Sequence, residues 1–206
     1  MSGFKPFYLY SPLGVVKLKN LFEWAFLMKT ETFPPEVAEI YDDVMNYFDY
    51  SKSAELIDTL ITHKGSKRRK TSILEVGIGT GSLARCLGNR GYEVWGVDHS
   101  PGMMEKAVSK GIYSSRLQLS DVMDFTLDQR FNAVISHADP LRLGYTAKRG
   151  HFFETYLSNE EQIMRAVNNI AKHIDSQGLL ILSAQTSPGR EYRLNSTPQK
   201  RDLGNG

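Results

Sequence analysis

The sequence predicts an α/β protein built on a doubly wound, mostly parallel sheet with helices on both faces. From Ser72 to Gln185, short runs rich in Val, Ile and Leu alternate with segments of helical periodicity. That alternation is typical of a parallel sheet covered on both sides. The 206 residues are 41% hydrophobic, which is an ordinary composition for a globular chain of one domain with an appended segment.

Charge and cysteine content narrow the functional classes. The formal net charge of +2 gives no reason to expect a nucleic-acid partner for the whole chain. The single cysteine, Cys86, excludes an internal disulfide and lies at an apolar helical position, so we expect a buried small side chain. The run 21–28 is too short to span a membrane, and the N-terminus lacks the pattern of a signal peptide. We therefore expect a cytoplasmic protein with no membrane association.

Residues 1–70 are predicted to form an N-terminal helical lid and a basic linker. Residues 1–33 are aromatic-rich and weakly patterned, whereas 34–63 carry two amphipathic helical patterns. The connector 64–70, KGSKRRK, is interpreted as a solvated linker. A contact with RNA or an anionic surface, or a localisation signal, stays open as an alternative.

Residues 71–185 are predicted to form the core, with five strands in 72–77, 92–98, 116–120, 131–138 and 178–185. The first helix follows the glycine turn and is closed by Gly91. The second begins with Ser100 as N-cap and Pro101 at its first position, and ends at Gly111. A later helix, 157–174, has the capping-box spacing of Ser158 and Glu161. Residues 186–206 form a polar tail in which we expect little packed structure.

A glycine turn follows the first core strand and indicates the kind of ligand. In Glu75-Val-Gly77-Ile-Gly79-Thr-Gly81 the glycines occupy every second position, and the position at which a dinucleotide fingerprint needs its third glycine is Ser82. An acid two residues before the first glycine would repel a pyrophosphate. It suits the positive charge of a zwitterionic amino-acid group that approaches the backbone closely.

This motif resembles the first motif of the class I S-adenosylmethionine-dependent methyltransferases, E/D-x-G-x-G-x-G. The resemblance extends from Ser72 to Gln185, with further motifs in the expected order. It implies a Rossmann-like fold and S-adenosyl-L-methionine as the cofactor. Glu75, Gly77, Gly79 and Gly81 would hold the amino-acid end of that cofactor.

The later motifs imply residues for the rest of the cofactor. In the family, the acid at the end of the second strand holds the ribose hydroxyls, which is Asp98 here, and Met103 would lie against the adenine. Asp121 would accept from the adenine amino group, and the backbone of Val122 would reach a ring nitrogen. Ser136 ends the fourth strand, where open α/β sheets place ligands. Helix capping for Asp98 and core packing for Met103 stay open.

Candidates for the chemistry itself are fewer. His137 stands at the carboxyl end of the fourth strand and is the preferred general base or acceptor-positioning group, with His151 as a weaker candidate. Asn132 stands where the family often has aspartate, at a position usually outside the ligand shell. Residues 139–141 lack the N/D-P-P-Y/F motif of methyltransferases that act on planar amino groups, which disfavours DNA and protein-glutamine substrates.

The lid segment resembles that of small-molecule methyltransferases, including enzymes that methylate sugar amines. On this resemblance, Tyr41 and Tyr50 would reach the cofactor or acceptor, and aromatic lid packing is the alternative. The aromatic residues of 4–28 and of the loop 138–156 could line a pocket for a mostly apolar small molecule. We expect a small-molecule acceptor, methylated on nitrogen or oxygen, and no metal site.

One departure from the family concerns the C-terminal side. The family usually continues after the fifth strand with another helix and two strands, whereas only the polar tail follows here. The chain is then a truncated or variant form, or it relies on a partner, and the exposed sheet edge could pair in a homo-oligomer. A non-catalytic binding or regulatory module, and an RNA or protein methyltransferase, therefore remain alternatives.

Overall fold

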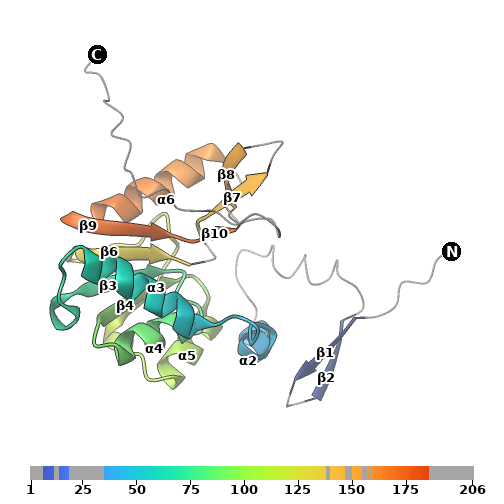
Figure 1. Ribbon diagram of the computed structural model, residues 1–206. Helices are drawn as coiled ribbons and strands as arrows, with labels where there is room; N and C mark the ends of the chain where they lie inside the picture. The colour runs from blue at the N-terminus through green and yellow to red at the C-terminus, as the bar shows by residue number, and fades with distance from the viewer. Residues whose placement is uncertain are drawn as a thin grey trace.

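A five-stranded, fully parallel sheet forms the centre of the structure (Figure 1). The structure, a computed structural model, describes residues 7–11, 14–18, 35–137, 140–146, 150–154, 157 and 159–185. The strand order is β5-β4-β3-β6-β9, with bounds Leu117–Leu119, Glu93–Asp98, Ser72–Val76, Phe131–Ser136 and Ile174–Leu182. The chain winds outward from β3 in both directions, so the predicted doubly wound α/β fold is confirmed.

Helices cover both faces of this sheet. They are α2 (Pro35–Val44), α3 (Tyr50–His63), α4 (Ser82–Asn89), α5 (Pro101–Ser109) and α6 (Glu160–Lys172), with short 3₁₀ turns η1 (Arg68–Lys70) and η2 (Ser114–Arg116). Figure 1 shows α6 on one side of the sheet and α3 and α4 on the other. Side chains of alternate strand residues therefore enter two separate cores.

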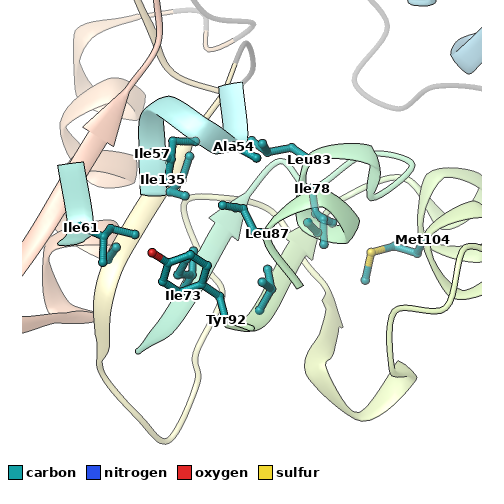
Figure 2. Close-up of a cluster of buried hydrophobic side chains, with 13 residues drawn as sticks. Ala54, Ile57, Ile61, Ile73, Ile78, Leu83, Leu87, Tyr92, Met104 and Ile135 are labelled. Carbon is teal, nitrogen blue, oxygen red and sulfur yellow. The ribbon is translucent and has the colours of Figure 1, made fainter. Parts of the chain in front are cut away.

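The core under α3 and α4 fixes the first strand. Ile73 of β3 and Ile135 of β6 pack with Ile57 of α3 and Leu87 of α4 in one buried cluster. Figure 2 shows these side chains converging between the helices and the strands. Burying each such side chain stabilises the fold by about 1.5–3 kcal/mol. Because side chains alternate along β3, Glu75 lies on the same face as Ile73 and is directed toward α4.

The second core lies under α6. Leu74 and Val76 of β3 pack there with Val134 of β6 and with Ala166 and Ile170 of α6. The face of α6 that carries Ala166 and Ile170 is therefore the one that it buries. Cys86, which we expected to be buried, packs against the first cluster but is only partly buried.

Most of the predicted helix boundaries hold. Ser100 caps α5 by accepting from the Met103 amide, and Pro101 opens the helix. Gly91 and Gly111 follow α4 and α5 with φ of 93° and 92°, a conformation that glycine adopts without strain. The N-cap of α6 is Asn159, whose side chain accepts from the Gln162 amide at 2.9 Å. The predicted cap, Ser158, lies outside the described residues.

Two hairpins occur where the sequence suggested no regular structure. β1 (Phe7–Ser11) pairs antiparallel with β2 (Gly14–Leu18), and β7 (Arg142–Thr146) pairs antiparallel with β8 (Gly150–Glu154). The short β10 (Ala184–Gln185) joins β7 in parallel. The aromatic and β-branched residues in these segments favour strands, and that preference outweighs their weak alternation.

Two further expectations are refined. The last core strand, β9, begins at Ile174 rather than at 178, and it is only partly buried, with Leu180 44% exposed. Among the described strands β9 pairs only with β6 of the central sheet, which leaves it at an edge. In the basic connector, Arg68 binds Asp58 at 2.6 and 2.8 Å, and Lys64 donates to the Gln177 carbonyl. Part of the connector's charge is therefore used within the fold.

Candidate functional site

A pocket opens at the carboxyl ends of β3 and β6, where the strand order reverses direction. Open α/β sheets place ligands at this position. The pocket is bounded by the turn after β3, by the segment from α2 to the start of α3, and by the end of β6. Its lining residues are Tyr41, Met45, Phe48, Tyr50, Glu75, Gly77, Ile78, Gly79, Thr80, Ser82, Leu83 and His137.

The glycines of the turn divide into two roles. Gly77, Gly79 and Gly81 all have positive φ, of 75°, 53° and 74°. A Cβ on Gly79 would meet no atom within 4 Å, so the backbone here faces open space. A Cβ on Gly81 would lie 3.1 Å from the Ala107 Cβ, so this glycine lets α4 pack closely against α5. Of these glycines, Gly77 and Gly79 line the pocket and Gly81 supports it from behind.

A further glycine, which sequence reasoning missed, sets the position of the turn. A Cβ on Gly96 of β4 would lie 2.3 Å from the Cδ1 of Ile78. Position 96 of β4 must therefore be glycine to leave room for the Ile78 side chain at the centre of the turn. A glycine in the middle of an otherwise apolar strand is the sequence signal for such a close approach.

Glu75 is a buried acidic side chain of the site. Its side chain is buried and, among the described residues, its Oε2 has no hydrogen-bond partner. Burial, with the nearby negative Asp98, raises the pKa of Glu75 to about 8, although the backbone amide of Ala84 in the first turn of α4 acts in the opposite direction. A buried carboxyl oxygen without a partner is costly unless a ligand completes it.

Asp98 ties β4 to the glycine turn. Its Oδ2 accepts from the Gly79 amide at 2.8 Å, and its Oδ1 accepts from the Ser100 amide at 2.9 Å. Burial raises the pKa of this carboxyl, and the two amides moderate the rise. Asp98 therefore shapes the turn and helps to open α5. Each oxygen keeps a lone pair that can accept from a ligand hydroxyl.

The remaining predicted cofactor residues lie outside the pocket lining. Met103 and Val122 are buried, and Asp121 accepts from the Met123 amide at 2.8 Å through its Oδ1. Ser136 is fully buried, and its Oγ accepts from the Leu141 amide at 3.1 Å, which closes the turn after β6. The structure thus gathers Tyr41, Tyr50, Glu75, Gly77, Gly79 and His137 in one pocket. The lining of this pocket does not include Gly81, Asp98, Met103, Asp121, Val122 or Ser136.

Aromatic rings form the outer wall. Phe48 lies edge-on to His137 at 4.9 Å between ring centroids and at 5.1 Å from Tyr50. Burial lowers the pKa of His137, so its imidazole is neutral at pH 7. Burial, together with Asp42 and Glu75, raises the pKa of Tyr50 to about 12 and keeps its hydroxyl protonated. Phe48 was not predicted as a pocket residue, because only its position beside His137 in the structure indicates that it forms part of the pocket wall. The side chain of His151, in β8, is outside the described residues.

In the part of the chain that the structure describes, no group of three or more His, Cys, Asp and Glu side chains could hold a metal ion. No described helix is long and apolar enough to cross a membrane.

The fold and the pocket define an α/β domain with a pocket at the switch point of its sheet. The chain belongs to the methyltransferase domain family, because a family model described as "Methyltransferase domain" matches residues 73–178, just over half of the chain. The resemblance seen in the motifs is confirmed at the level of the family.

Individual relatives are more distant. A curated relative from Bacillus subtilis (strain 168), named "Putative methyltransferase YqeM", is 24% identical over 73% of this chain and 54% of its own length. The sugar N-methyltransferase KedS8 from Streptoalloteichus sp ATCC 53650 has a TM-score of 0.54 and 24% identity, over 72% of this chain and 53% of its own. DesVI from Streptomyces venezuelae has a TM-score of 0.55 and 24% identity, over 73% and 58%. The chain thus spans little more than half the length of these relatives.

Proposed function

We propose that the chain binds S-adenosyl-L-methionine and transfers its methyl group to a nitrogen or oxygen atom of a small molecule. The observation that carries the proposal is the buried Glu75 Oε2, unpartnered among the described residues, beside a glycine turn whose backbone is open at Gly79. Such a carboxylate complements the ammonium group of the cofactor's methionine moiety. The bare backbone at Gly77 and Gly79 lets that moiety approach closely.

The other residues extend the site along the cofactor. Asp98 would accept from the ribose hydroxyls, Asp121 and the Val122 backbone would meet the adenine, and Met103 would pack near it. Ser136 and Gly81 would hold the surrounding backbone. Tyr41 and Tyr50 would cover the methionine end. The bound cofactor supplies an electrophilic methyl group on a sulfonium centre, and the protein's task is to align the acceptor and exclude water.

His137 is the proposed catalytic group. It lines the same pocket as Glu75 and Gly79, and its lowered pKa leaves a neutral imidazole that can take a proton from a hydroxyl or ammonium acceptor. Phe48 and Tyr50 pack against this ring and limit its orientation.

A small-molecule acceptor is favoured over RNA or protein for two reasons. The structural relatives include proteins described as a sugar N-methyltransferase and as an amino pentose methyltransferase, the latter, CalS10 from Micromonospora echinaspora, with a TM-score of 0.53 at 21% identity. The basic connector also gives two of its charges, Lys64 and Arg68, to contacts within the fold.

The experiment is a turnover screen by mass spectrometry, with S-adenosylmethionine and panels of amines, phenols and short RNAs. We expect a product 14 Da heavier from the amine or phenol panel, and a loss of about 10²–10⁴-fold in His137→Asn, the range of general-base catalysis. Saturable cofactor binding without any product would favour the alternative, a non-catalytic binding module. Methylated RNA alone would contradict the small-molecule proposal.

A further inference from the structure

A charged cluster behind the pocket joins the lid helix α2 to the glycine turn. The Asp42 Oδ2 of α2 lies 2.5 Å from the Lys110 Nζ, just after α5. The Asp42 Oδ1 accepts from the Thr80 Oγ1 at 2.7 Å and from the Ser82 Oγ at 3.3 Å. One carboxylate thereby contacts a cation and two hydroxyls of the turn.

Lys110 contacts the same two hydroxyls. Its Nζ donates to the Thr80 Oγ1 and to the Ser82 Oγ, each at 2.8 Å. Thr80 and Ser82 line the pocket, whereas Asp42 and Lys110 are not among its lining residues. The charged pair therefore acts on the pocket through the two hydroxyls and fixes which way their protons and lone pairs point.

The cluster is set apart from ordinary surface pairing by its burial. The Lys110 side chain is 19% exposed and that of Asp42 39%, whereas Thr80 is 2% exposed. Although burial alone would raise it, the hydrogen bonds from Lys110 and Thr80 hold the pKa of Asp42 below its ordinary value. Ionised partners in a partly buried network interact more strongly than exposed ones.

The same two helices carry a second ion pair that serves as a comparison. Glu39 of α2 and Lys106 of α5 lie 2.7 Å apart, about one helical turn away from Asp42 and Lys110. Glu39 is 65% exposed, so this pair joins α2 to α5 on the solvent side. Both pairs join a carboxylate of α2 to a lysine in or just after α5. Only Asp42 and Lys110 also contact the Thr80 and Ser82 hydroxyls of the turn.

We propose that Asp42 and Lys110 are positioning residues for cofactor binding, which hold Thr80 and Ser82 in the orientation that the methionine end requires. Tyr41, the neighbour of Asp42 on α2, lines the same pocket. This inference rests on the proposed function, because the ligand whose affinity it concerns is the one proposed there.

The test is a double-mutant cycle read by equilibrium binding of S-adenosylmethionine, with thermal unfolding in parallel. Asp42→Asn keeps the shape and removes the charge, and Glu39→Gln is the matched control on the same helix. We expect Asp42→Asn to weaken binding about tenfold and Glu39→Gln to stay within about twofold. In a Thr80→Val/Ser82→Ala background, Asp42→Asn should change the affinity by less than about twofold, because both hydroxyls through which it acts are gone.

Two readouts separate positioning from plain stability. A merely structural Asp42 would lower the unfolding temperature in both backgrounds and leave the affinity of the folded protein unchanged, which would overturn the inference. Equal losses of affinity with and without the Thr80 and Ser82 hydroxyls would overturn it as well. If the unaltered protein bound no S-adenosylmethionine, the proposed function would fall and this inference with it. Faster hydrogen exchange of α2 amides in Asp42→Asn than in Glu39→Gln, measured without cofactor, would support the contact itself.

Discussion

Particular polar side chains at the two ends of the parallel sheet differ in how they are hydrogen-bonded. At the amino end, Asn132 accepts from the Ser72 amide at 2.9 Å and donates to Asp175 at 3.0 Å. His173 accepts from the Leu127 amide through its Nε2, and its Nδ1 lies 2.8 Å from the Asn169 carbonyl. At the carboxyl end, Glu75 is buried with an unpartnered Oε2 among the described residues. Of these groups, only Glu75 is left with an unpartnered oxygen, although the buried Nε2 of Gln129, two residues before β6, also lacks a partner among the described residues.

The two ends of the sheet therefore differ in whether their polar side chains contribute mainly to stability or to ligand binding. Satisfied buried groups fix the strands at modest net gain, whereas an unsatisfied carboxyl costs free energy that only a bound partner returns. The glycine turn with positive φ lies at the same end as Glu75. Changes at the amino end should therefore alter stability, and changes at the carboxyl end should alter binding.

The largest expected effect comes from Glu75→Gln. The amide keeps the shape and removes the negative charge that complements the cofactor ammonium. We expect S-adenosylmethionine affinity to fall about 100-fold or more, as for truncating one partner of a buried charge pair. Isothermal titration measures the loss, and circular dichroism checks the fold. An affinity equal to that of the unaltered protein would remove Glu75 from the site.

The pH dependence of the free energy of unfolding tests the same difference between the two ends of the sheet. The pKa of Glu75 is about 8 in the folded protein against 4.5 ordinarily, so the native state holds a proton that the unfolded state has lost between these values. The free energy of unfolding should then fall as pH rises through this window, by up to about 1.4 kcal/mol per pH unit from this group. Burial also raises the pKa of Asp98, so this group too lowers the free energy of unfolding as the pH rises.

Urea unfolding of the cofactor-free protein at pH 5, 6, 7 and 8 measures this slope. In Glu75→Gln most of the decline should disappear, and this variant should be the more stable of the two at pH 8. A parallel decline in both proteins would show that other groups cause it.

Gly79→Ala and Gly65→Ala form a matched pair with a smaller effect. Both glycines have positive φ, 53° and 87°, and a Cβ at either position would meet no atom within 4 Å. Each substitution should cost about 1 kcal/mol of stability for backbone strain. Because only Gly79 lines the pocket, only Gly79→Ala should weaken cofactor binding, by about tenfold. Equal affinities in the two variants would place the ligand elsewhere.

The smallest effect is expected at the amino end, in Asn132→Asp. This restores the residue that the family often carries, but it replaces the donor to Asp175 with a second carboxylate. We expect a loss of about 1 kcal/mol in the free energy of unfolding at pH 7, since like charges in contact repel, and unchanged cofactor affinity. Serine at 175, in Asn132→Asp/Asp175→Ser, should recover the stability. A change in binding would break the proposed separation of the two ends.

The sequence predicts the parts of this molecule that depend on local pattern. Runs of Val, Ile and Leu locate the five core strands, and Ser100, Pro101 and Gly111 bound α5, because these signals act within a few residues. The motif from Glu75 to Gly79 likewise places the centre of the pocket. The hairpins β1–β2 and β7–β8 lacked such alternation and were missed.

What depends on tertiary contact could not be predicted. Nothing near Asp42 in the sequence indicates that it meets Lys110 and Thr80, and Phe48 acquires a role only beside His137. Ser136 was predicted at the cofactor, and its hydroxyl also accepts from the Leu141 amide, a contact between residues five apart that no local pattern indicates. The cofactor roles of Asp98, Met103, Asp121, Val122 and Ser136 stay predictions.

The central claim is that Glu75 gives up a proton to receive the cofactor ammonium. Isothermal titration of S-adenosylmethionine at pH 7, repeated in two buffers of different ionisation enthalpy, counts the protons released on binding. With a pKa of about 8, Glu75 is protonated in about nine-tenths of the free molecules at pH 7, so the account predicts a release of close to one proton, lost in Glu75→Gln. No saturable binding, or binding with the same proton count in both proteins, would contradict it.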